Sequence, residues 1–229
     1  MRERKVVAAR KPKLTRAEKA AHNRAKLMRA AQEVIGDYGY AEASVARIVE
    51  RAGLAQGTFY IYFEARQDLF DQLLPEVGDE ALSSIRDAVS GAKNFAAVEE
   101  RGLRAFFEFA VSNPAFFRIF SEAEIAAPEA HGKYIRKRTG RYLEAVTAAW
   151  KRGEIRGYTQ RELGVLTQIM LASRAYLFQA YAKTSGGVKA PPAWVVDTYM
   201  KFLTRGIGGG KPASPPPAVR RRKRASPAG

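Results

Sequence analysis

The stretch "LAQGTFYIYFEAR", Leu54 to Arg66, decides the fold class of this chain. Its centre, Thr58 to Phe63, contains only residue types that are favoured in β-strands. A lone strand among helices would leave backbone N–H and C=O groups unpaired, at a cost of about 1–3 kcal/mol for each buried group. A helix instead sorts the side chains onto two faces. One face holds Phe59, Tyr62 and Phe63, and the other holds Gly57, Tyr60 and Ile61. We therefore expect a short helix with the first group packed inward.

The sequence on both sides of this stretch predicts helices. Apolar residues recur at helical spacing from Leu27 to Ile35, and again from Leu69 to Leu74. Pro75 either kinks the second of these helices or starts the next one. Predicted helix starts and stops, in chain order, are the capping box of Thr15 and Glu18, then Gly39, Ser44 and Gly53. The order is a long helix, a short helix, a turn at Gly53 and a second short helix. This order is typical of a helix-turn-helix, whose second helix enters the major groove of DNA.

The rest of the chain is also predicted to be helical, with no convincing strand pattern. The expected helices span about 80–90, 95–112, 115–125, 129–152, 160–183 and 191–205, separated by Gly, Pro and Asn residues. The predicted fold class is all-α: an N-terminal three-helix helix-turn-helix domain followed by a larger helical bundle for ligand binding and dimerisation. The predicted parts are a basic arm (1–14), the DNA-binding domain (15–75), the larger domain (76–207) and a disordered basic tail (208–229).

The positive charge lies at the two ends of the sequence. The formal net charge is +16, and residues 1–29 hold 11 Lys and Arg against 2 Glu. Residues 211–229 hold 6 Lys and Arg and no acidic residue, whereas the remaining residues carry 22 basic and 21 acidic groups. Charged arms around a nearly neutral body suit a polyanion, which is either nucleic acid or an anionic membrane surface. The run Arg220 to Arg224 either adds non-specific DNA affinity or is a solvated tail.

Several classes of protein do not fit the composition. The chain has no cysteine, so it has neither a disulfide framework nor a thiolate zinc site. His22 and His131 stand alone, without a ligand set for a metal. The apolar segment from Val165 to Ala182 is interrupted by polar residues and is not a membrane span. "GIGGGK" lacks the residues of a phosphate-binding loop. We expect a cytoplasmic protein that is not an enzyme, has no cofactor and does not bind membranes.

The segment "ASVARIVERAGLAQGTFYIYFEARQDLF" resembles the N-terminal part of the TetR family of bacterial transcriptional regulators. The shared features are the Gly53-Leu54 turn, the run from Gly57 to Tyr60, Tyr62-Phe63, and a basic residue at Arg66 ahead of Asp68-Leu69-Phe70. The similarity spans about residues 24–75; beyond residue 80 it is architectural. The resemblance implies a dimeric regulator, most often a repressor, that binds a palindromic DNA operator and is released by a small-molecule effector.

Chemistry and this resemblance together assign DNA-binding roles. Ser44, at a helix N-terminus, can bind a phosphate. Gln56 is the candidate for base reading, because its amide can pair with adenine through two hydrogen bonds. Gly57 lets the backbone approach the groove, and Thr58 can contact a base methyl group or a phosphate. The resemblance adds phosphate contacts from Tyr60, Tyr62 and Arg66.

Some of these roles have structural alternatives. Tyr62 is either a phosphate ligand or a core residue, and Arg66 is either a phosphate ligand or an ordinary solvated charge. Many family members have Ser or Thr at the place of Ala55 and Arg at the place of Ala46, so this chain lacks one cap and one possible base contact. The short helix that begins after Ser44 is therefore expected to read few bases. The basic arm can compensate by entering the minor groove.

Two successive helices of the larger domain, around Phe106–Phe109 and Phe116–Phe120, are rich in aromatic residues. Their rings either form the core of the bundle or line an apolar ligand cavity. The resemblance implies such a cavity, and its candidate lining residues are Leu103, Phe107, Phe120, Met170 and Tyr176. Arg118 or Arg174 could meet an acidic effector, but a salt bridge to Glu108 or Glu122 is the alternative.

The helix at about 160–183 is apolar nearly all round and needs cover on two faces. The simplest cover is the same helix of a second subunit, together with Trp194, Val195, Tyr199 and Phe202 of the helix at about 191–205. The sequence therefore predicts a homodimer through these two helices, which also suits a palindromic operator. The alternative is a non-specific nucleoid or membrane-surface protein that uses only the basic arms.

Overall fold

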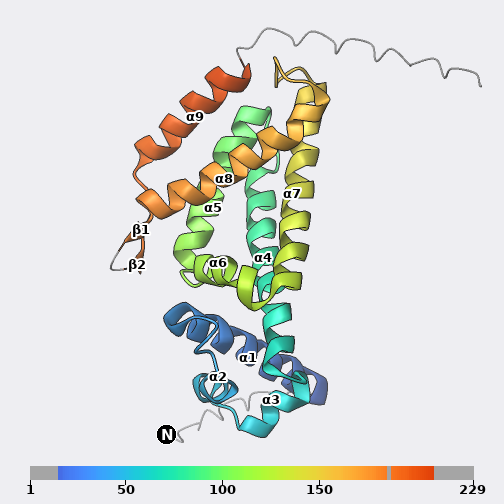
Figure 1. Cartoon of the computed structure of the whole chain (residues 1–229), viewed down its shortest axis with the longest axis vertical. Coiled ribbons are helices and arrows are strands. Elements are labelled where there is room, and N and C mark those ends of the chain that lie inside the picture. The colour runs from blue at the N-terminus through green and yellow to red at the C-terminus, as the bar shows by residue number, and fades with distance from the viewer. Residues whose placement is uncertain (1–14, 185–186, 209–229) are drawn as a thin grey trace, which may run out of the picture. The chain divides into compact units, whose positions relative to one another are not determined.

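The computed structural model describes residues 15–184 and 187–208, and this part of the chain is almost wholly helical (Figure 1). The predicted all-α fold class is confirmed. The helices are α1 Arg16–Tyr38, α2 Val45–Ala52, α3 Gln56–Tyr62, α4 Arg66–Val89, α5 Phe95–Ser112, α6 Phe116–Ala126, α7 Pro128–Lys151, α8 Leu163–Tyr181 and α9 Ala193–Gly208, with a 3-10 turn η1 Gln160–Glu162 before α8. The predicted arm, 1–14, and nearly all of the predicted tail, 208–229, lie outside the described residues.

The predicted start and stop signals of α1 and α2 are confirmed. The Thr15 hydroxyl accepts a hydrogen bond from the Glu18 N–H at 3.2 Å, and the Glu18 carboxylate accepts one from the Thr15 N–H at 2.7 Å. These bonds hold the pKa of Glu18 below its usual value. The Ser44 side chain caps α2, and Gly53 ends it in the left-handed conformation with φ +63°. Local sequence chemistry is therefore sufficient to fix the ends of both helices.

Two details differ from the sequence-based expectation. Helix α4 runs through Pro75 to Val89, so Pro75 does not start a new helix, and the separate helix expected at about 80–90 is part of α4. A small antiparallel strand pair, β1 Lys183–Thr184 and β2 Gly187–Val188, follows α8, although no strand was expected. Each strand has only two residues, which is too short for a periodic apolar pattern to show in the sequence.

The described residues form two compact units. The first contains the residues up to Ala81 together with Ser112–Ile135, and the second contains Leu82–Val111 and the residues from Arg136 onward. Helices α4 and α7 each contribute residues to both units. Packing therefore groups α6 with α1, α2 and α3, although α6 follows α5 in the chain. The division into functional domains at residue 75 stays a prediction.

The first unit is built around fully buried aromatic and aliphatic residues of α1 to α4. Its core includes Leu27, Ile35, Ile48, Phe59, Phe63, Leu69, Phe70 and Leu73. Two close approaches bring further helices onto this core. A Cβ at Gly36 of α1 would lie 2.7 Å from the Cβ of Ala115, just before α6, and Gly78 of α4 lies against the Tyr134 ring of α7. Glycine at both positions allows these contacts, which hold α6 and the start of α7 within the unit.

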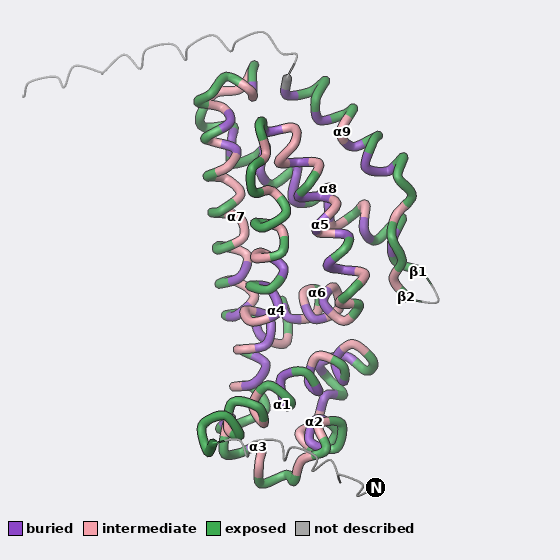
Figure 2. The backbone as a smooth tube through the Cα atoms, turned by 180° about the vertical axis from the view of Figure 1, so that it is seen from behind, coloured by how far each residue is buried: buried purple, intermediate pink, exposed green. Residues whose placement is uncertain are grey.

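The second unit contains α5, the later part of α7, α8 and α9, and α5, α8 and α9 each bury one side (Figure 2). Its core includes Leu103, Phe107, Val146, Leu163, Phe178, Val195 and Leu203. The Trp150 ring nitrogen of α7 donates a hydrogen bond to the Tyr158 carbonyl at 2.9 Å, which ties α7 to the loop before α8. Large apolar side chains nevertheless remain exposed on α8 and α9.

Candidate DNA-binding surface

The aromatic stretch that opened the sequence analysis forms the short helix α3. Phe59 is 0% exposed and Phe63 1%, whereas Tyr60 is 55% exposed and Ile61 73%. The predicted inward and outward faces are therefore confirmed for these four residues. Phe63 itself lies just after the helix, with φ −138°, and not in its last turn. Tyr62 is half-buried, so its ring is partly core and partly accessible.

The turn between α2 and α3 presents the start of α3 to solvent. Gly53 and Leu54 donate backbone hydrogen bonds to the carbonyls of Glu50 and Val49 at 3.1 and 3.0 Å. Helix α3 then begins after Ala55, which supplies no side-chain cap, as its methyl group predicts. The Thr58 N–H donates to the Ala55 carbonyl at 2.9 Å, so the first turn of α3 is closed by the backbone and not by a side-chain cap.

The seven predicted DNA-binding residues lie in one short segment of the first unit. Gln56, Gly57 and Tyr60 are exposed on α3, and Thr58 and Tyr62 are half-buried. Ser44 lies at the N-terminus of α2, where its oxygen accepts the Arg47 N–H at 3.3 Å. The Arg66 guanidinium lies over the Phe70 ring at 5.3 Å and reaches the Ala41 carbonyl at 3.5 Å. Arg66 is thus held close to the loop before α2 while remaining exposed.

The arginines of α2 are engaged by neighbouring residues, which sequence reasoning did not foresee. Arg47 forms an ion pair with Glu42 at 2.9 Å and lies 5.1 Å from the centre of the Tyr38 ring. Arg51 pairs with Glu33 and Asp37, at 3.2 and 2.9 Å. Both side chains return toward α1 or its following loop, so both arginines are engaged, and the exposed face of α2 also carries Ala46 and Glu50.

Helix α6 holds the end of α1 through one ion pair. Arg118 donates hydrogen bonds to the carbonyls of Gly36 and Asp37, at 3.1 and 2.9 Å. Glu122 accepts the Tyr40 N–H at 2.9 Å and binds Arg118 at 2.7 Å. We call Arg118 and Glu122 the α6 latch. Sequence analysis had left Arg118 open between an effector and Glu122, and the structure shows the pair with Glu122.

Comparison with known proteins gives this helix-turn-helix a family. Residues 27–73 match the model described as bacterial regulatory proteins, tetR family. The helix-turn-helix of this chain is therefore of the TetR family type. The chain is 39% identical over 66 residues to the uncharacterised HTH-type transcriptional regulator YvdT of Bacillus subtilis, covering 29% of this chain and 32% of that protein. It is also 28% identical to the HTH-type transcriptional regulator EthR of Mycolicibacterium smegmatis, over 82% of this chain and 87% of that protein.

Solved structures extend the similarity of the fold beyond the helix-turn-helix. The transcriptional regulator FadR from Bacillus subtilis, in complex with stearoyl-CoA, superposes with a TM-score of 0.69 at 17% identity, covering 80% of this chain and 99% of FadR. At this identity the match shows a shared fold. The first three curated relatives are matched over only 32%, 24% and 45% of their own lengths. The sequence similarity to them is therefore concentrated in part of each protein.

The five predicted effector-binding residues are not gathered in one place. Leu103, Phe107 and Met170 are buried in the second unit. Phe120 belongs to the first unit, where its ring lies 5.9 Å from that of Tyr134. Tyr176 is 70% exposed on α8, so in the single chain it lies on the surface. Leu103, Phe107 and Met170 remain as the candidates that share one core.

Beside Met170 lies a buried polar cluster that sequence analysis missed. The Glu99 carboxylate of α5 accepts hydrogen bonds from Arg174 of α8 at 3.0 Å, from Tyr199 of α9 at 3.0 Å, and from Tyr142 of α7. Glu99 is 0% exposed and Arg174 7%. The Tyr142 hydroxyl lies 3.5 Å from the Met170 sulfur. We call Glu99, Tyr142, Arg174 and Tyr199 the Glu99 cluster.

Burial dominates the protonation behaviour of this cluster. It raises the pKa of both Tyr142 and Tyr199, so both hydroxyls stay protonated and donate. Burial alone would lower the pKa of Arg174, but the adjacent Glu99 carboxylate raises it on balance. Three donors therefore surround one carboxylate. The only sign of this cluster in the sequence is that Glu99 and Arg174 are charged residues on otherwise apolar faces of their helices.

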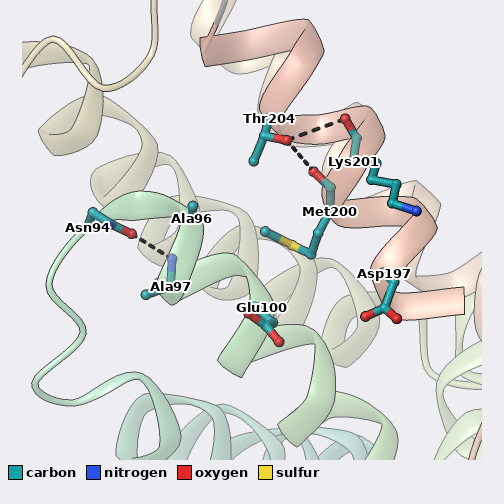
Figure 3. Close-up of a pocket in the computed structure, with 8 residues that line it drawn as sticks. All are labelled: Asn94, Ala96, Ala97, Glu100, Asp197, Met200, Lys201 and Thr204. Atoms are coloured by element: carbon teal, nitrogen blue, oxygen red, sulfur yellow. Dashed lines mark hydrogen bonds between the residues drawn. The ribbon is translucent and has the colours of Figure 1, made fainter. Parts of the chain in front are cut away.

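An open groove runs between the start of α5 and α9 in the second unit, with a volume of about 610 Å³ (Figure 3). Its polar side chains are engaged locally. Asn94 accepts the Ala97 N–H at 2.8 Å, Thr204 donates to the Met200 carbonyl at 2.8 Å, and Glu100 pairs with Arg104 at 2.9 Å. None of the five predicted effector-binding residues lines it.

Two further classes of site were sought in the described residues. No group of three or more His, Cys, Asp and Glu residues lies close enough together there to hold a metal ion. Within the same residues, none of the helices combines the length and apolarity that crossing a membrane requires.

Proposed function

We propose that this chain is a DNA-binding transcriptional regulator that reads its operator with α3. The observation that carries the proposal is the exposed surface of α3, which offers Gln56, Gly57 and Tyr60 while Phe59 and Phe63 anchor the helix in the core. Gln56 would read a base edge in the major groove, and Tyr60 and Arg66 would bind phosphates. The match of residues 27–73 to the TetR family model supports this assignment.

Selection of bound fragments from genomic DNA tests the proposal, because it also identifies the operator. Gln56→Ala is expected to weaken binding to the selected operator by about 1–3 kcal/mol and to relax the preference at one base pair. Ile125→Ala is the matched control, since Ile125 is also exposed in the first unit but lies at the end of α6. If Gln56→Ala and Tyr60→Ala together leave operator affinity unchanged, α3 is not the reading helix.

The competing function is a non-specific nucleoid or membrane-surface protein that binds through its basic ends. A specific regulator should prefer its operator over random DNA by about 10³-fold or more at physiological salt. A nucleoid protein would show no such preference, and its affinity would follow salt concentration alone. Deleting 211–229 is expected to weaken binding to all sequences alike; an unchanged salt dependence would exclude a DNA role for this segment.

We propose further that the regulator is a homodimer through α8 and α9. Val165, Ile169 and Tyr176 of α8 and Trp194 and Phe202 of α9 are all at least half exposed in the single chain. Burying such side chains contributes about 1.5–3 kcal/mol each, so a second subunit is a favourable cover. Val195 and Tyr199 were expected at this interface, but both are buried within the unit.

A two-fold dimer would place two α3 helices on equivalent half-sites of a palindromic operator. Sedimentation of the whole chain at micromolar concentration is expected to give a dimeric mass. Tyr176→Glu should shift the chain toward monomer and reduce operator affinity, because it places a charge in the apolar interface. Glu144→Gln, at an exposed site of α7, is the control for a surface substitution. A monomeric mass for the unmodified chain would exclude the dimer.

We propose that a small apolar effector releases the operator, which makes the protein a repressor. The fold it shares with FadR, whose structure contains stearoyl-CoA, supports a binding role for the second unit. The effector must bind the operator-free state more tightly than the operator-bound state, because otherwise it does not shift the equilibrium between them. A compound that binds tightly and leaves operator affinity unchanged would contradict this coupling.

A further inference from the structure

Helix α8 has an arrangement of side chains that is unusual for an exposed helix. Arg174 is the only charged residue between Leu163 and Tyr181, and it points inward with 7% of its surface exposed. Large apolar side chains of the same helix, including Ile169 and Tyr176, point outward. Hydrophobic burial within one chain would favour the opposite arrangement, with the charge in water.

Apolar residues lie on both the inward and the outward sides of α8. The inward side carries Leu163, Leu166, Met170, Leu171 and Phe178, and the outward side carries Val165, Ile169, Ala172 and Tyr176 together with the exposed Gln168 and Gln179. At 100° per residue the centres of the two apolar sets lie about half a turn apart. The apolar pattern alone therefore specifies only part of the rotation of α8 about its own axis. A further contact can select the side that faces the core.

The Glu99 cluster supplies that selection. Arg174 donates to Glu99 at 3.0 Å and lies 4.8 Å from the centre of the Tyr142 ring. The cluster takes one residue from each of α5, α7, α8 and α9. Gly102, one turn after Glu99 on α5, lies beside the guanidinium: a Cβ there would be in van der Waals contact with Arg174, at 3.4 Å. A half-turn of α8 would leave the Glu99 carboxylate buried without its counter-charge, which is strongly unfavourable.

We infer that the Glu99–Arg174 pair fixes the rotation of α8 and so selects which apolar side remains available to a second subunit. The second part of this inference, the choice of the side available to a second subunit, rests on the homodimer proposed above. Arg174 is thus a positioning residue for the interface, although it does not lie in the interface. A single buried polar residue can specify helix register in the same way in coiled coils.

The rotation of α8 can be measured by thiol labelling, because the natural chain has no cysteine. Ile169→Cys reports the outward side and Leu171→Cys the inward side. In an otherwise natural chain, Leu171→Cys should react at least about tenfold more slowly than Ile169→Cys in dilute protein. Dimerisation at higher concentration should protect position 169 and leave position 171 unchanged.

The test removes both charges and keeps both sites polar, Glu99→Gln with Arg174→Gln, because an apolar residue at 174 would itself favour the inward side. Helical content should persist, while labelling of Leu171→Cys rises about tenfold and the dimer becomes heterogeneous in sedimentation. The matched control is Glu100→Gln with Arg104→Gln, an exposed ion pair of the same types on α5. The control should leave the labelling rates at both positions unchanged.

Unchanged protection at position 171 in the uncharged double variant would overturn the inference, because the apolar pattern and side-chain shape would then fix the rotation without the charge pair. If that variant does not fold, Glu99→Gln carries the test: it keeps acceptor capacity and removes the charge, and it too must raise labelling at position 171. The mass of the natural chain separates the two proposals. A monomer that still shows the labelling contrast, and loses it in the variants, would refute the homodimer and support the role of the pair in fixing α8.

Discussion

The α6 latch and the Glu99 cluster are both built on an arginine–glutamate pair, yet they act by different physics. Arg118 and Glu122 lie one turn apart on the same helix, and their side chains are 40% and 36% exposed. Arg174 and Glu99 lie on different helices, 75 residues apart, and are 8% and 0% exposed. The latch is a solvent-screened contact supported by backbone hydrogen bonds, whereas the cluster is a charge pair whose partners cannot be separated without burying a bare charge.

The largest expected effect is on the buried pair. Arg174→Met leaves the Glu99 carboxylate buried with only two tyrosine hydroxyls as donors, so it should lower the free energy of unfolding by about 3–5 kcal/mol. Glu99→Leu combined with Arg174→Met should recover most of that loss, because no unpaired charge remains. Chemical denaturation of the three proteins measures both values. Equal destabilisation by the single and the double replacement would show that the pair itself is stabilising.

The two pairs also show how far sequence reasoning reaches. Arg118 and Glu122 stand four residues apart, so helical periodicity brings them together without knowledge of the fold, and this alternative was named in advance. Glu99 was not identified, because its contacts with α7, α8 and α9 depend on how four helices pack. For Arg174 the sequence suggested an acidic effector or a salt bridge to Glu108 or Glu122, and its partner in the structure is Glu99.

The same distinction explains why the buried side of α3 was predicted correctly from the sequence. Phe59 and Phe63 fall on one side of a short amphipathic segment, so the sequence specifies which side packs inward. The α8 sequence is apolar on two sides, so it does not specify which of them packs inward. Tyr176 was consequently predicted to line a cavity, although it lies on the surface. Helix ends set by local chemistry were predicted well, and the β1–β2 pair was missed because it is too short to leave a pattern.

A smaller effect is expected at the turn that the latch holds. Gly39 has φ +84° and ψ 170°, a conformation that is essentially restricted to glycine. A Cβ there would also lie 2.7 Å from the Arg118 guanidinium and 2.8 Å from the Glu122 carboxylate. Gly39→Ala should therefore lower the free energy of unfolding by about 1–3 kcal/mol and weaken operator binding if α1 and the turn shift together. Gly140→Ala is the control, because a Cβ at this exposed position of α7 meets no atom within 4 Å.

The smallest expected effect is the pH dependence of the latch. Partial burial raises the pKa of Glu122, but hydrogen bonds from Arg118 and the Tyr40 N–H outweigh it, so the pKa lies below the ordinary value of 4.5. A lowered pKa in the folded state stabilises the protein above the unfolded value, and that contribution is lost as pH falls through the folded value. Because the pair is more than a third exposed, the contribution should stay below about 1 kcal/mol.

Denaturation curves between pH 6 and about pH 3 test this contribution, since the unfolded carboxyl titrates within that window. In Glu122→Gln the free energy of unfolding should fall slightly less between pH 6 and about pH 3. Near pH 6 it should be lower than in the natural chain. If the free energy of unfolding fell equally at acid pH in Glu122→Gln and in the natural chain, the backbone contacts of Arg118, and not the Glu122 charge, would hold α1 to α6.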